Sequence, residues 1–152
     1  MRKTNVQQWL VLMAICVGLI WAAQSRADAP MDQYAMMGGT VLDRKTQLTW
    51  EQNADTSTFT FDEAKAHCDT LTLGGLKWRV PSMKEFQTIV DETLVDPSAD
   101  PNAFPDTKID DYWTSSIYEP DPTSAWTLHA DFGGTGVDPV TTPHYVRCVH
   151  GP

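Results

Sequence analysis

The segment Trp78–Phe86, WRVPSMKEF, decides how the chain folds around it. Pro81 pushes the residue before it into an extended conformation, so the first half of the segment is not helical. Ser82 and Glu85 then form a capping box, in which the two side chains bond exposed amide groups at the start of a helix. The sequence therefore predicts a helix that begins at Ser82 and ends at about residues 91–94.

A second capping box, at residues 60–63, predicts an earlier helix. Ala64, Cys68 and Leu71 recur at the spacing of one helical face, so this stripe is expected to face the core. The pair Gly74-Gly75 is expected to end the helix.

Strands are expected on both sides of the two helices. Residues 40–42 and 48–51 flank a polar connection and predict a hairpin. Residues 112–116, 124–132 and 144–149 mix aromatic and β-branched residues as strands do. The order predicts an α+β domain: a small antiparallel sheet with two helices and long irregular loops.

Residues 1–27 have the composition of a bacterial signal peptide, with three basic residues and no acidic one. The apolar run, residues 9–23, is shorter than the roughly 20 residues that cross a bilayer. Small residues at the appropriate spacing predict cleavage after Ala27 or Ala29. A secreted, cell-surface or periplasmic protein is expected, with an uncleaved membrane anchor as the alternative.

Export would leave a flexible lead over residues 28–37 and one domain over residues 38–152. Losing the leader removes 3 of the 11 basic residues and none of the 20 acidic ones, so the mature net charge is −12. This charge repels nucleic-acid phosphates and anionic lipids. Neither nucleic acid binding nor membrane insertion of the mature domain is expected.

Cleavage would leave two cysteines, Cys68 and Cys148. An even pair in an oxidising compartment predicts a disulfide. The alternative is a nucleophilic Cys68 activated by His67, but side chains adjacent on a helix do not face each other.

Nine short motifs follow one another over residues 41–149. They are Val41-Leu42-Asp43, Leu48-Thr49-Trp50, the Ala64–Cys68 helix, Gly74-Gly75, Trp78–Pro81, Lys84–Phe86, Phe104-Pro105, Tyr112–Ser116 and Val146–Val149. In order and spacing they resemble the C-terminal domain of the Legionella collagen-like adhesins. The resemblance implies a C-type lectin-like fold that presents ligands on irregular loops.

In the name-giving adhesins this domain follows a collagen-like stalk, forms a trimer and binds sulfated polysaccharide. The present sequence has no Gly-x-y segment, so a stalk-driven trimer is not expected and the oligomeric state is left open. Its acidity also disfavours sulfated ligands, which are recognised by clustered Arg and Lys.

Three residues are candidates for ligand binding. Trp126 and Tyr118 lie near a proline-rich turn, where an amphipathic ring exposed to solvent is able to stack on a sugar. Arg79 is a candidate clamp for an anionic ligand beside Trp78. The alternative places Trp78 in the core and pairs Arg79 with a carboxylate or with backbone carbonyls.

Calcium is the cofactor to consider, because it binds several hard oxygen ligands. Asp106, Asp110 and Asp111 offer carboxylates in a long loop, but no EF-hand spacing is present, so no cofactor is the primary expectation. The histidines have no metal-ligand spacing with the cysteines, and no serine has a nucleophile motif. The chain is therefore predicted not to be an enzyme.

These features together predict an exported adhesion module that recognises a glycan or an extracellular protein. The alternative is a structural subunit of a cell-envelope, secretion or pilus-associated assembly.

Overall fold

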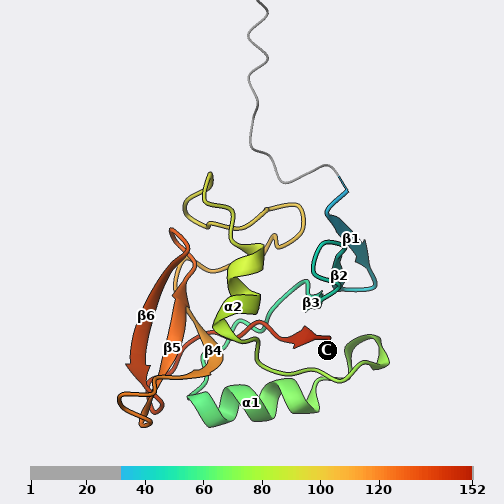
Figure 1. Cartoon of the computed structure of the whole chain (residues 1–152). Helices are drawn as coiled ribbons and strands as arrows, with labels where there is room; N and C mark the ends of the chain where they lie inside the picture. The colour runs from blue at the N-terminus through green and yellow to red at the C-terminus, as the bar shows by residue number, and fades with distance from the viewer. Residues whose placement is uncertain (1–31, 152) are drawn as a thin grey trace, which may run out of the picture.

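The computed structural model describes residues 32–151, which form two small antiparallel sheets and two short helices (Figure 1). The first sheet has the order β1-β2-β3-β7: β1 Tyr34–Met37, β2 Thr40–Asp43, β3 Thr49–Glu51 and β7 Val149–His150. The second has the order β4-β5-β6: β4 Asp111–Ile117, β5 Ser124–His129 and β6 Gly134–Pro139. The α+β class is confirmed, although two sheets replace the single sheet expected.

The predicted signal peptide, residues 1–27, lies outside the described residues. Within residues 32–151, none of the helices has the length and apolar character needed to cross a membrane.

Two strands were not predicted. β1 lies inside the stretch expected to be a flexible lead, so the ordered part begins before Gly38. Gly38 and Gly39 both have positive φ and form the tight turn into β2, a signal that could have revealed this hairpin. β6 contains two glycines and Pro139, which favour a loop, but an edge strand tolerates proline because its outer N–H groups need no partner.

The expected strand over residues 144–149 is confirmed only at its end. Val149 and His150 pair with β3, while the preceding residues run extended through isolated bridges to Phe59 and Tyr112. This last segment therefore connects the two sheets.

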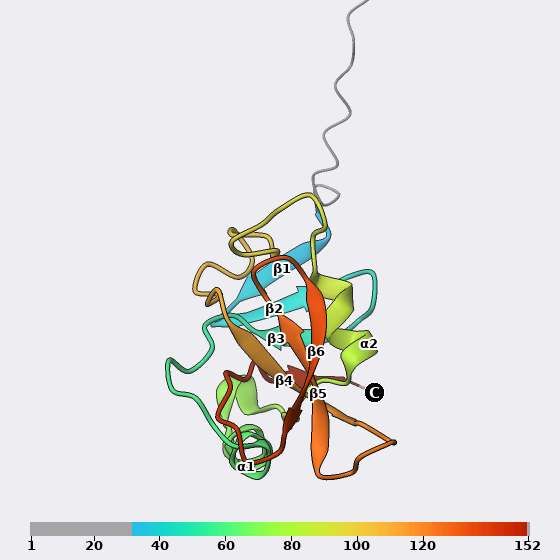
Figure 2. The same ribbon diagram turned by 90° about the vertical axis from the view of Figure 1, so that its left-hand side faces the viewer.

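Helix α1, Phe61–Thr70, begins at its predicted capping box. The Glu63 carboxylate accepts hydrogen bonds from the Thr60 N–H and hydroxyl, at 2.9 and 2.7 Å. The helix ends before the expected glycine pair, because residues 73–75 form a separate 3-10 turn in which Gly74 has positive φ. In both views α1 lies at the end of the molecule opposite β1 (Figures 1 and 2).

Helix α2, Met83–Phe86, also begins at its predicted box and continues as a 3-10 turn, Gln87–Ile89. Its Phe86 lies between the sheets, with ring centroids 5.8 Å from Trp50 of β3 and 5.6 Å from Tyr112 of β4. Burying these three rings joins α2 to both sheets, so the helix start has a fixed position over the β4–β6 sheet.

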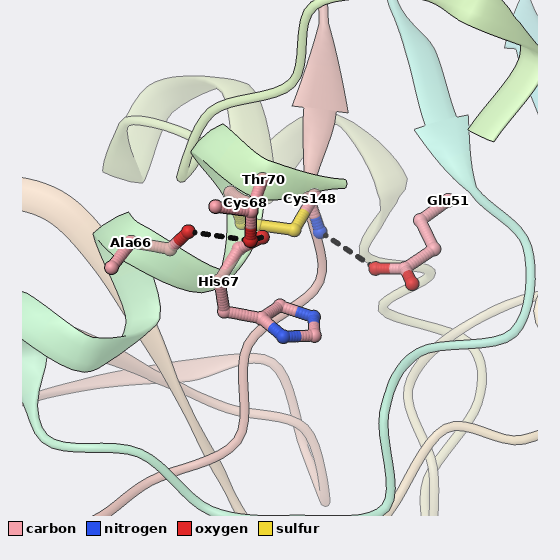
Figure 3. Close-up of a disulfide and its surroundings, with 6 residues drawn as sticks. All are labelled: Glu51, Ala66, His67, Cys68, Thr70 and Cys148. Atoms are coloured by element: carbon pink, nitrogen blue, oxygen red, sulfur yellow. Dashed lines mark hydrogen bonds between the residues drawn. A yellow bond between two sulfur atoms is a disulfide. The ribbon is translucent and has the colours of Figure 1, made fainter. Parts of the chain in front are cut away.

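The predicted disulfide between Cys68 and Cys148 is present, with the two Cα atoms 5.6 Å apart (Figure 3). Both cysteines are fully buried in a cluster of apolar side chains that includes Ala64 and Val146, and Leu71 packs against this cluster. The bond therefore links α1 to the end of the chain.

Candidate functional site

A surface cleft of about 450 Å³ lies where the start of α2 approaches the β4–β6 sheet. It is lined by Ser82, Met83, Lys84, Gln87, Ser116, Trp126 and Thr135. The Met83 N–H donates to the Ser116 hydroxyl oxygen at 3.1 Å, which joins the helix to β4. The two walls of the cleft are therefore held together by the fold.

Trp126 forms part of the cleft wall and is half-buried. Successive side chains of its strand, β5, point to opposite faces of the sheet, so Trp126 lies on the same face as Leu128. This is the face that α2 covers. Tyr118 packs edge-on against Trp126, with ring centroids 5.5 Å apart and planes at 80°. The structure thus brings these two predicted residues together, with Trp126 in the wall and Tyr118 supporting it.

Arg79 does not line the cleft. Its guanidinium donates to both carboxylate oxygens of Glu85, at 2.8 and 2.6 Å. Trp78 is almost fully buried, and its ring N–H donates to the Leu73 carbonyl at 2.9 Å. These contacts match the structural alternative, in which Trp78 fills the core and Arg79 pairs with a carboxylate.

The Arg79 side chain lowers the pKa of Glu85 to about 2, from an ordinary value of 4.5. Because the pKa falls on folding, the ion pair stabilises the protein above about pH 4.5, and this contribution is lost as the pH falls towards 2. We expect Glu85→Gln to lower the free energy of unfolding at pH 7 by about 1–2 kcal/mol, after allowing for solvent screening of a partly exposed pair. Urea unfolding at pH 7 and near pH 2 measures the difference.

The matched control for this prediction is Glu119→Gln, which removes an exposed loop carboxylate. It should change the stability little at either pH. An equal loss for Glu85→Gln at both values would contradict the ion-pair explanation and assign the loss to the capping box alone.

The three aspartates considered for calcium have partners within the chain. Asp106 accepts from Arg147 at 2.9 Å, Asp110 accepts the N–H of Asp111 at 2.8 Å, and Asp111 pairs with His129. Among the described residues these three carboxylates do not form one ligand cluster. The expectation of no cofactor therefore stays a prediction, with calcium on this loop as its alternative.

The sequence did not reveal the polar residues of the cleft, namely Lys84, Gln87, Ser116 and Thr135. They lie on α2, β4 and β6, so only the packing of the helix on the sheet brings them together. The sequence signal that was available is the capping box of Ser82 and Glu85, which places Met83 and Lys84 in the first turn of a helix.

The fold and the cleft define a small, disulfide-bonded α+β module with an aromatic residue in a surface cleft. The chain belongs to the Lcl C-terminal domain family, whose family model matches residues 39–150. The resemblance found from the motifs is therefore confirmed, and it marks the chain as an adhesion-related module. No curated protein matches the chain.

Proposed function

We propose that this chain is an exported, non-catalytic adhesion module that binds a glycan in the Trp126 cleft. The observation that supports the proposal is the chemical composition of the cleft walls. Met83 and Trp126 offer apolar surface for the C–H face of a sugar ring. The polar residues around them offer donors and acceptors for hydroxyl groups, the usual composition of a small-ligand site.

The proposed ligand is a neutral glycan. Among the described residues that line the cleft, Lys84 is the one that is basic, and the mature chain would carry a net charge of −12. A sulfated polysaccharide needs several Arg or Lys groups to offset its charge. We also infer a C-type lectin-like arrangement, on the basis of the family and of the two small antiparallel sheets with two short helices and long loops.

Trp126→Ala should weaken glycan binding by about tenfold or more, because truncating an aromatic anchor removes both contact area and shape. A glycan array, run with and without calcium, would first identify the ligand, and titration calorimetry would then compare the variants. Calcium alone should shift the melting temperature little, because the acidic loop has no recognisable ligand spacing, and a rise of many degrees would contradict this.

Phe132→Ala is the matched control, since Phe132 is an exposed aromatic residue next to β5 that does not line the cleft. It should leave binding unchanged. Equal affinity of wild type and Trp126→Ala, with both proteins folded, would refute the assignment of this cleft.

A subunit of a cell-envelope assembly is the second candidate, and β1 is the observation that favours it. This strand forms one edge of its sheet, and its Met37 is 81% exposed. An edge with unpaired backbone groups and apolar side chains is suited to pairing with another exported chain. A wild-type protein that binds no glycan with or without calcium would favour this role.

A further inference from the structure

A second group of polar side chains lies on the other face of the β4–β6 sheet. The strand register pairs Asp111 with His129, and Ala125 with Asp138. Side chains alternate between the two faces along a strand, and directly paired residues share a face. Asp111, His129 and Asp138 therefore lie on one face with Thr127. This is the face opposite Trp126, so the group is separate from the cleft.

The segment after β6 adds His144 to the group. One carboxylate oxygen each of Asp111 and Asp138 and a ring nitrogen of His144 lie within 4.8 Å of one another. Backbone hydrogen bonds between His144 and Phe59, at 2.8 and 2.9 Å, fix the histidine, and its ring packs edge-on against Trp113. The imidazole is thus positioned by the fold rather than by a flexible loop.

The His144 ring nitrogen has an unusual environment. Nε2 is buried and has no hydrogen-bond partner among the described residues, and the residue is 9% exposed. Asp138 Oδ2 is 3.4 Å away, an ion-pair distance, but the two groups are not aligned for a hydrogen bond. A buried polar atom without a partner is costly and needs an explanation.

Two further features extend this polar space. The Thr127 hydroxyl is also buried and without a hydrogen-bond partner among residues 32–151. A Cβ atom at Gly136 would lie 2.7 Å from Thr127 Oγ1 and 2.8 Å from His129 Nε2, so only glycine leaves both groups room. Gly136, one of the two glycines that made this strand look like a loop in the sequence, therefore has a local role.

We propose that Asp111, Asp138 and His144 bind a divalent transition-metal ion of the zinc class. Imidazole with carboxylate is a donor set that suits such ions, whereas calcium prefers oxygen ligands alone. Zinc takes these donors at about 2.0–2.2 Å, which places two ligands of one ion at most about 4.4 Å apart, so small side-chain rotations suffice.

His129 is the positioning residue of this site. Its Nδ1 pairs with Asp111, and its ring stacks on Phe132 at 5.7 Å. A hydrogen bond to a ligating carboxylate fixes its orientation, as is usual around protein metal sites. The Asp111, Asp138 and His129 side chains are 23–33% exposed, so an ion has access from solvent.

The second potential ligand group, Glu51, His67 and Cys148, is a weaker candidate. The sulfur of Cys148 is bonded to Cys68, and the His67 ring lies beside the disulfide (Figure 3). A disulfide sulfur is a poor ligand because metals bind the thiolate. This leaves the Asp111 group as the zinc site.

The test uses protein purified from cells that express the full chain, stripped with a chelator and titrated with zinc chloride. Zinc at about 100 times its dissociation constant should raise the melting temperature by about 5 °C or more, and calcium at the same concentration should not. In calorimetric titrations, Asp138→Asn and His144→Gln should each weaken zinc binding by about tenfold or more. Cobalt(II) should give the absorption spectrum of a low-coordinate site in wild type but not in Asp138→Asn or His144→Gln at the same cobalt concentration.

Asp69→Asn, which changes an exposed carboxylate on α1 outside the cluster, is the matched control and should bind zinc as wild type does. Asp138→Asn should fold, because Asp138 is partly exposed and Asn has the same shape. This variant therefore tests the zinc site even where His144→Gln fails to fold. A wild type that does not bind zinc, or equal binding by Asp138→Asn and Asp69→Asn, would overturn the proposal.

Discussion

Cys68→Ser and Cys148→Ser should each lower the free energy of unfolding by about 2–5 kcal/mol. The two cysteines are 80 residues apart in sequence, so the bond removes much of the conformational freedom of the unfolded chain, up to about 4.5 kcal/mol in the chain-entropy description. The double variant should be no less stable than either single variant, because either substitution already removes the whole bond. Guanidinium unfolding of the three variants measures this.

Wild type treated with a reductant provides an independent control, and its stability should fall to that of the double variant. Ala64 and Val146 surround the bond in a cluster of buried residues, so the thiols freed by reduction would stay in an apolar site. Two free thiols in the untreated protein, detected by mass spectrometry, would show that the bond does not form and would reopen Cys68 as a reactive residue.

Local signals in the sequence predicted local structure well. Both capping boxes lie at helix starts, because a Ser or Thr followed by Glu bonds within its own turn and needs no distant partner. The hairpin of β2 and β3 was predicted for the same reason, since a polar turn lies between two short apolar segments. The positions of helix ends were less accurate, as α1 and α2 both stop early where a 3-10 turn replaces regular helix.

Residues that come together through the sheets were harder to predict. Asp138 and Asp111 are distant in sequence and lie on different strands, so no spacing rule relates them to His144. Their proximity depends on β6, a strand whose glycines and proline favour a loop. Tyr118 and Trp126 were identified because they lie on either side of one short turn between β4 and β5, but the α2 wall of their cleft depends on tertiary packing.

Arg147→Met should lower the free energy of unfolding by about 3–5 kcal/mol. Arg147 is 1% exposed. Its Nη1 donates to the carbonyls of Glu51 and Gln52 at 2.7 and 2.6 Å. Its Nη2 donates to Asp106 at 2.9 Å.

The large loss of stability is expected because the substitution leaves the hydrogen-bond acceptors of Arg147 without a donor. Two backbone carbonyls at the end of β3 and the Asp106 carboxylate would lose their donor in a water-poor site, and each unsatisfied group costs about 1–3 kcal/mol. The guanidinium also lies over the Phe104 ring, 5.0 Å from its centroid. Arg147 thus anchors the long loop before β4 to the first sheet, and its loss should speed hydrogen exchange over residues 100–110.

Arg44→Met is the matched control, since Arg44 is exposed and should contribute less than about 1 kcal/mol. Combining Arg147→Met with Asp106→Asn should be less destabilising than the sum of the two single losses, because much of the cost of the first is the unpaired Asp106 charge. A loss below about 1 kcal/mol for Arg147→Met, measured by chemical unfolding, would contradict this role. Strictly additive losses would show instead that the Asp106 ion pair does not hold the loop, because Asp106 would then contribute the same whether or not Arg147 is present.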